Sequence, residues 1–307
     1  MNKKIWKWNS LRRQAQELSE RVSRLLPEYA SRWSRMDSCS SRIIMKECEC
    51  GNAHLALASF CRDRLCPVCQ WRRSLAIAER VRAVTGGKPK LLFVTLTIKN
   101  VEWRKLHQGI AQIMDAWKRL QERTNFRAAI QGYVRILEIT RGHDGKAHPH
   151  LHILCEPAAD YFGRQYMTAW SWGQLWKRAL QVEYDPIVDV RSCNDKKGAA
   201  AYVAKYTGKI LPLSSLSDEE LVLYIRQIRG VRLVGSGGSL RMSDSEIEQS
   251  EMIGARGSCI CEKCGGSMST HWYDWARDVK KYRCVDIPDS ICNNDIEVND
   301  VGPREVT

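Results

Sequence analysis

Hydrophobic positions in the first part of the chain recur with helical spacing. Over residues 10–26 they form one apolar stripe that Pro27 ends. A second helix is expected over residues 73–84, since a glycine pair follows at 86–87. Residues 102–122 have the same helical spacing. The N-terminal half therefore predicts three amphipathic helices.

A different pattern, rich in β-branched and apolar residues, predicts strands over residues 91–98, 133–140, 148–154 and 186–191. A glycine-containing turn at residues 141–145 joins the second and third strands into a hairpin. Further helices are expected over residues 163–180 and 196–207 and from Ser217 onwards. This order of elements is typical of an α+β fold, with an antiparallel sheet and helices on one face.

The chain divides into four expected regions. They are a basic N-terminal helix at 1–35, a cysteine-rich zinc module at 36–88, a central α+β domain at 89–235, and an acidic accessory region at 236–307. The glycine-rich segment 235–238 is expected to be a flexible boundary.

Charge is unevenly distributed along the 307 residues. The net charge is +13, but residues 1–242 contain 41 of the 48 basic and only 22 of the 35 acidic residues, an excess of +19. Such an excess suits a polyanionic partner such as DNA, although a merely soluble basic surface would have the same composition. No apolar run is long enough to serve as a signal or to span a bilayer, so a cytoplasmic protein without a membrane partner is expected.

Three of the seven histidines fall within the five residues from His148 to His152. Side chains alternate between the faces of a strand, so His148, His150 and His152 point the same way while Leu151 faces the core. Glu138 on the preceding strand can add an oxygen ligand. The pattern predicts a divalent metal site, with a solvated polar strand face as the alternative.

Two tyrosines, Tyr202 and Tyr206, lie four residues apart in a helical segment and therefore share one helix face. A phenol becomes a useful nucleophile where a metal polarises the target phosphate and lysines stabilise negative charge. Lys205 and Lys209 can do the latter. The alternative is that the tyrosines pack in the core.

Thirteen clustered cysteines favour metal ligation over disulfides. The spacing of Cys61, Cys66 and Cys69 predicts a structural zinc site completed by Cys50, which Cys48 can replace. Redox-active or inert buried thiols are the alternative.

A second zinc knuckle is predicted near the C-terminus. Its expected ligands are Cys261, Cys264, Cys284 and Cys292, with Cys259 or His271 as substitutes. Cys39, Cys155 and Cys193 are interpreted as packing or incidental residues. Trp170, Trp172 and Trp176 could stack on bases, but their near-helical spacing favours packing.

These motifs together resemble those of the rolling-circle replication initiators of small bacterial plasmids, members of the HUH endonuclease superfamily. The resemblance covers residues 45–240 and rests on CRDRLCPVC at 61–69, FVTLT at 93–97, the run of histidines and the tyrosine segment YVAKY at 202–206. The paired tyrosines are similar to those of phage gene A initiators, whereas many plasmid members have glutamate in place of Tyr202.

The resemblance implies a sequence-specific DNA nickase. His150 and His152 would ligate magnesium or manganese, and Tyr206 would form a 5′-phosphotyrosine and leave a free 3′-hydroxyl as primer. The reaction would then be ended either by Tyr202, as a second nucleophile that alternates with Tyr206, or by some other base. Plasmid DNA at the double-strand origin, a host helicase and a polymerase are the implied partners. The alternatives are a single-strand transposase or relaxase of the same superfamily, and a zinc-dependent DNA-binding repressor that does not cleave.

Overall fold

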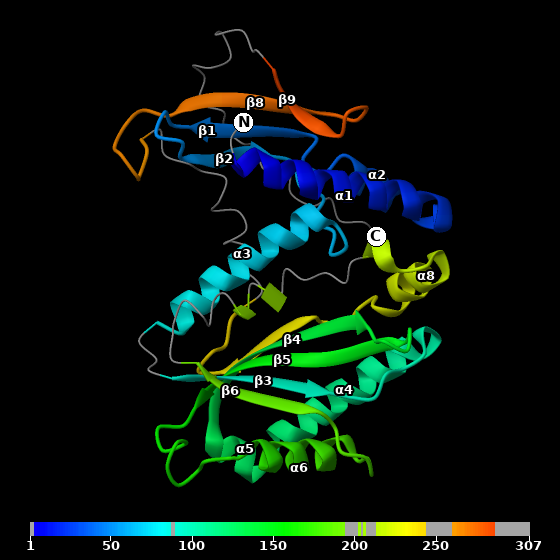
Figure 1. The fold of residues 1–307 in the computed structure, drawn as a ribbon, viewed down its shortest axis with the longest axis vertical. Coiled ribbons are helices and arrows are strands. Elements are labelled where there is room, and N and C mark those ends of the chain that lie inside the picture. Colours follow the sequence, from blue (N-terminus) through cyan, green and yellow to red (C-terminus); the bar gives the residue numbers. More distant parts are fainter. Residues whose placement is uncertain are drawn as a thin grey trace.

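Two antiparallel sheets, with helices between them and beneath one of them, make up the fold (Figure 1). This computed structural model describes residues 3–86, 90–193, 202–203, 205–206, 213–243 and 260–285. An α+β architecture is therefore confirmed.

The larger sheet has five strands in the order β6-β3-β5-β4-β7, and all neighbouring strands are antiparallel. Their bounds are β3 Leu91–Thr97, β4 Ile130–Arg141, β5 Ala147–Pro157, β6 Val188–Cys193 and β7 Val234–Gly238. The predicted hairpin is the β4–β5 pair. The expected flexible boundary at 235–238 is wrong, because these residues form the edge strand β7, which pairs with β4.

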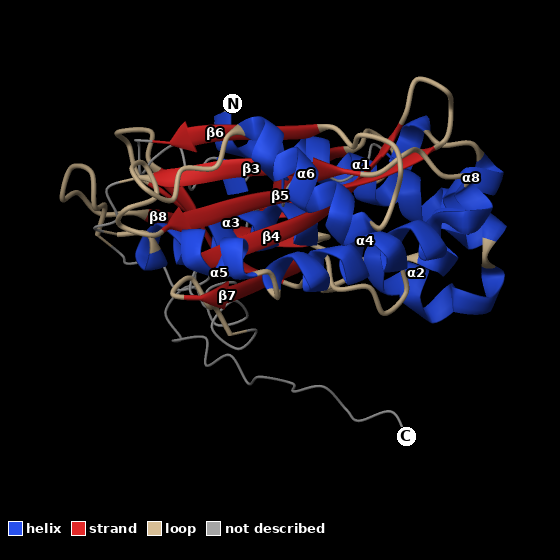
Figure 2. Cartoon of the chain, turned by 90° about the horizontal axis from the view of Figure 1, so that it is seen from below, coloured by secondary structure: helices blue, strands red, loops and turns tan. Residues whose placement is uncertain are grey.

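Three helices cover one face of this sheet and lie in front of it in Figure 2. They are α4 Leu106–Gln121, α5 Thr124–Ala129 and α6 Ala169–Leu180. Their apolar side chains pack with alternate residues of the central strands, among them Leu96, Leu151 and Ile153. Alternation along β5 therefore sends its histidines to the opposite face.

The opposite face contacts a further helix, α3 Pro67–Val84, which begins earlier than expected. Ile77 and Val81 of α3 pack with Val134, Leu154 and other buried residues of the sheet. Helices thus lie on both faces, whereas one face was predicted.

A second sheet of four strands has the order β2-β1-β8-β9. Its strands are β1 Arg42–Glu47, β2 Ala53–Ala58, β8 Ser269–Ala276 and β9 Lys281–Val285, and the helices α1 Lys3–Leu25 and α2 Ala30–Asp37 pack beside it. In Figure 1 this sheet lies at the opposite end of the molecule from the larger one. Segments expected in separate N- and C-terminal regions therefore share one sheet.

Among the described residues, the remaining elements are η1 Pro27–Tyr29, η2 Trp103–Lys105, η3 Leu213–Ser215 and α8 Asp218–Gln227. A capping box begins α8, since the Ser217 hydroxyl accepts from the Glu220 N–H and the Glu220 carboxylate accepts from the Ser217 N–H. Most of the helix expected over 196–207 lies outside the described residues; Tyr202 and Tyr206 themselves have helical backbone.

Candidate metal and tyrosine site

Three side chains from the hairpin β4–β5 converge on the sheet face that contacts α3. Glu138 is the register partner of His150, and Ile136 that of His152, so the carboxylate lies beside both imidazoles. Glu138 Oε2 is 3.1 Å from His150 Nε2 and 2.7 Å from His152 Nε2. All three residues are buried. The structure thus brings together Glu138, His150 and His152 as one group able to hold a metal ion.

The outer ring nitrogens of both histidines have partners. His150 Nδ1 donates to the backbone carbonyl of His148 at 3.0 Å, so this nitrogen carries a proton. Nε2 is therefore the ring nitrogen of His150 that faces the Glu138 carboxylate. His152 Nδ1 is 3.2 Å from the hydroxyls of both Thr95 and Tyr202. Such partners fix ring orientation and tautomer at metal sites.

Glu138 is negatively charged despite its burial. Burial raises the pKa of this carboxyl, but hydrogen bonds from His150 and His152, with their charge, outweigh that effect and bring the pKa to about 2. A buried anion flanked by two imidazoles is a suitable donor set for a divalent cation.

His148, the third predicted histidine, lies outside this group. Its Nδ1 is 2.6 Å from Asn100 Oδ1, and its ring stacks on His150 with centroids 4.9 Å apart. Burial lowers the pKa of His148, which favours the neutral ring. His148 therefore packs beside the candidate metal site.

Both predicted tyrosines lie against the same group. The ring of Tyr206 stacks on His152, with centroids 3.5 Å apart, and Lys205 Nζ lies 5.2 Å from the centre of the Tyr206 ring. The ring of Tyr202 stacks on that of Phe93 with centroids 3.9 Å apart, and the Tyr202 hydroxyl lies within hydrogen-bond distance of His152 Nδ1. Burial raises the pKa of Tyr202 above its usual range. Lys209 lies outside the described residues.

Sequence reasoning missed three neighbours of this site. Thr95 and Phe93 were seen only as part of a strand, but their register on β3 puts them on the histidine face. Arg191 of β6 pairs with Phe93, and its charge interacts with both tyrosines. Alternation along the predicted strand over 91–98 could have shown that residues 93 and 95 share a face.

The cysteines form two groups that differ from the predicted ones. The first consists of Cys39, Cys61, Cys66 and Cys69. Cys39, which was interpreted as incidental, takes the place expected for Cys50 or Cys48, and its Sγ is 3.6 Å from that of Cys69. Cys48 and Cys50 lie too far away to join this group, because β1 separates residue 39 from residues 48–50 by roughly 20 Å of extended chain.

The second group consists of Cys48, Cys50, Cys261 and Cys264. The predicted partner Cys284 lies exposed on β9, outside both groups, and His271 does not join them. Cys259 and Cys292 lie outside the described residues. Cys155 and Cys193 are buried among apolar side chains, as predicted.

Packing is confirmed for two of the three tryptophans of α6. Trp172 and Trp176 are fully buried, whereas Trp170 is 73% exposed, so its interpretation as a core residue is wrong.

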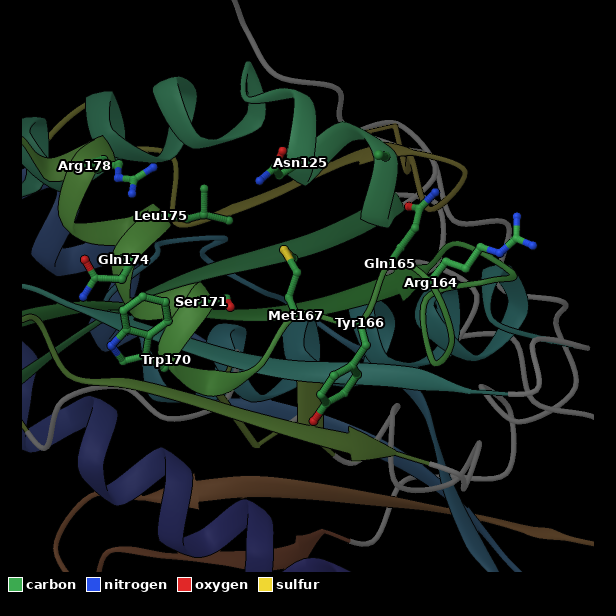
Figure 3. A pocket seen from close by; sticks show the side chains of 11 residues that line it. Asn125, Arg164, Gln165, Tyr166, Met167, Trp170, Ser171, Gln174, Leu175 and Arg178 are labelled. Atoms are coloured by element: carbon green, nitrogen blue, oxygen red, sulfur yellow. The ribbon is translucent and has the colours of Figure 1, made fainter.

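Trp170 lines a pocket of about 410 Å³ together with Tyr166 and two arginines, Arg164 and Arg178 (Figure 3). The pocket lies on the sheet face that α4, α5 and α6 cover, whereas the histidines lie on the opposite face.

Within the described part of the chain, no helix is both long and apolar enough to cross a membrane. Comparison with protein families matches residues 52–283 to a family described as "Replication protein". No solved structure matches the chain significantly.

Curated relatives named "Protein rep" are similar over much of the chain. One from Bacillus amyloliquefaciens is 29% identical over 283 residues, covering 80% of this chain and 84% of the relative. One from Streptococcus pneumoniae is 29% identical over 238 residues, covering 71% and 74%. One from a Bacillus species is 35% identical over 177 residues, covering 55% and 58%.

Proposed function

The chain belongs to the replication protein family, and from this premise we propose that it starts plasmid rolling-circle replication by nicking one DNA strand with Tyr206. One observation supports the proposal most. Tyr206 stacks on His152, directly beside the buried group of Glu138, His150 and His152. The proposed nucleophile and the proposed cation site thus lie next to each other on one face of the sheet.

In this proposal the Tyr206 hydroxyl oxygen attacks the phosphorus of the scissile phosphodiester and releases its proton to solvent. The bond from phosphorus to the 3′-oxygen breaks, and that oxygen takes up a proton. The products are a 5′-phosphotyrosine and a free 3′-hydroxyl. Because the phosphodiester energy is kept in the covalent link, the strand can be rejoined by the reverse reaction.

His150, His152 and Glu138 would hold the magnesium or manganese ion that the resemblance implies. The ion, when bound, supplies positive charge that polarises the phosphate. The donor set fits, since two imidazoles and a charged, buried carboxylate meet at one point. The His148 carbonyl holds His150 in place from the other side of its ring.

For Tyr202 the geometry supports positioning rather than a second nucleophilic role. Its hydroxyl lies on His152 Nδ1, its ring is stacked on Phe93, and burial keeps the phenol neutral by raising its pKa. A hydroxyl that accepts from His152 Nδ1 leaves Nε2 free as a ligand. Lys209 stays a predicted catalytic lysine.

The group of Cys39, Cys61, Cys66 and Cys69 would bind structural zinc, since four thiols within reach of one another form a closed site. The basic excess of residues 1–242 would hold plasmid DNA at the double-strand origin. The free 3′-hydroxyl would then be extended by a host polymerase after a helicase opens the duplex.

The test uses single-stranded oligonucleotides that tile the replicon encoding the chain. With manganese present, the wild type should cut one oligonucleotide, and Tyr206→Phe should cut none while binding it with unchanged affinity. Loss of the attacking oxygen removes little packing area, so folding should persist. Equal cleavage by both proteins would place the nucleophile elsewhere, and no cleavage by the wild type would favour a non-catalytic DNA-binding protein.

A further inference from the structure

The second cysteine group lies where two distant parts of the chain meet. Cys48 and Cys50 belong to the turn between β1 and β2, and Cys261 and Cys264 belong to the turn that precedes β8. Because β1 pairs with β8 up to Glu47↔Ser269, the two turns lie opposite each other at the same end of the sheet.

In each turn a glycine N–H donates a backbone hydrogen bond to the carbonyl of a cysteine. In the first, the Gly51 N–H donates to the Cys48 carbonyl at 2.8 Å; in the second, the Gly265 N–H donates to the Cys261 carbonyl at 2.8 Å. The two glycines have φ of +79° and +73°, a region that side chains disfavour. Each turn thus presents two thiols to the other.

Sulfur positions fit a tetrahedral thiolate site. Sγ of Cys48 is 3.4 Å from that of Cys264, and Sγ of Cys50 is 3.6 Å from that of Cys261. These separations are far beyond the ~2.05 Å of a disulfide. Zinc–sulfur bonds of about 2.3 Å in a tetrahedron place sulfurs roughly 3.8 Å apart, close to what is observed.

We propose that Cys48, Cys50, Cys261 and Cys264 bind one zinc ion and form a clasp between segments 211 residues apart. Four protein ligands leave no open position, so the clasp is structural and separate from the nicking chemistry. It holds β8 and β9 in the sheet that begins with β1 and β2. The Asn52 side-chain amide donates to Cys261 Sγ at 3.4 Å, which stabilises a thiolate there.

Of the two cysteine groups, the clasp is the more accessible. Cys50 and Cys264 are exposed, whereas Cys39 and Cys66 of the other group are buried. Chelators and oxidants therefore reach the clasp first. Zinc should leave the wild type in two phases, and the faster phase belongs to the clasp.

Zinc content measured by native mass spectrometry tests the proposal on the full chain. The wild type should carry two zinc ions. Cys261→Ser/Cys264→Ser should carry one, and so should Cys48→Ser/Cys50→Ser. Combining all four substitutions should remove no further ion, because the four thiols serve one site. Cys284→Ser, an exposed cysteine outside both groups, is the matched control and should keep two.

Circular dichroism of each variant shows whether a lost ion reflects a lost site or a lost fold. A folded Cys261→Ser/Cys264→Ser protein with as much zinc as the wild type would overturn the proposal. If that variant unfolds, zinc release from the wild type tests the proposal instead. During the fast phase of release, an alkylating reagent should label Cys48, Cys50, Cys261 and Cys264. Labelling of Cys39 and Cys66 in that phase instead would also overturn it.

Discussion

At the scale of single residues, the contacts of Glu138 organise the candidate site. Alternation along the predicted strands was enough to put three histidines on one face and Glu138 near them. Alternation could not show that His148 lies outside the group of possible metal ligands. The hydrogen-bond partner of His148 is Asn100, which follows β3 and lies 48 residues away in the sequence. Long-range contacts of this kind have no local signature in the sequence.

Replacing both His150 and His152 with alanine should weaken manganese binding by more than about 100-fold, since loss of even an outer partner at a metal site costs 10–100-fold. Isothermal titration calorimetry with Mn²⁺ measures this directly. His148→Ala is the matched control on the same strand face and should change affinity by less than about tenfold. Equal affinity in the double variant, or an equal loss in the control, would contradict the assignment.

Tyr202→Phe separates positioning from nucleophilic attack. Losing the hydroxyl on His152 Nδ1 should slow nicking by roughly 10–100-fold and weaken Mn²⁺ binding, while Tyr206 remains the residue that carries DNA. Nicking rates and calorimetry on the same preparation give both readouts. If Tyr202 carried nucleotide in the wild type or in Tyr206→Phe, the two tyrosines would alternate as nucleophiles.

At the scale of elements, hydrophobic spacing predicted the strands β3, β4, β5 and β6, but it predicted neither the four strands of the smaller sheet nor the edge strand β7. Its glycines indicated a loop, yet they let β4 side chains lie across the edge strand. A Cβ atom at Gly237 would lie 2.7 Å from the Tyr133 ring, and one at Gly235 would lie 2.8 Å from the Arg135 guanidinium, in each case the register partner. Glycine is needed here for close approach, which composition alone cannot distinguish from flexibility.

Gly238→Ala should lower the free energy of unfolding by about 2 kcal/mol or more, because φ is +61° and the new methyl would lie 2.0 Å from the Gln131 carbonyl oxygen. Gly173→Ala, in the interior of α6 with open space around it, should instead raise it by roughly 0.5–1 kcal/mol. Urea titrations measure both. A neutral Gly238→Ala would mean that residues 234–238 do not pair as a strand.

At the scale of the whole molecule, the sequence predicted the class of fold and the family. It did not predict that N-terminal and C-terminal strands, expected in separate regions, share one sheet. The C-terminal segment from Ser269 to Val285 completes a sheet begun by residues 42–58. Spacing along the chain grouped cysteines with their sequence neighbours, whereas strand pairing regrouped them across 211 residues. Pairing between distant strands depends on the tertiary fold and cannot be read from local spacing.

If the chain nicks DNA as proposed, Tyr206 becomes covalently attached to a cut DNA end. The most direct measurement incubates the wild type with the cleaved oligonucleotide, isolates the adduct that survives denaturation, and identifies the modified peptide by mass spectrometry. We expect a nucleotide attached to Tyr206 through its phenolic oxygen and a free 3′-hydroxyl on the released fragment. Cleavage without any adduct, or an adduct on a residue other than Tyr206, would contradict it.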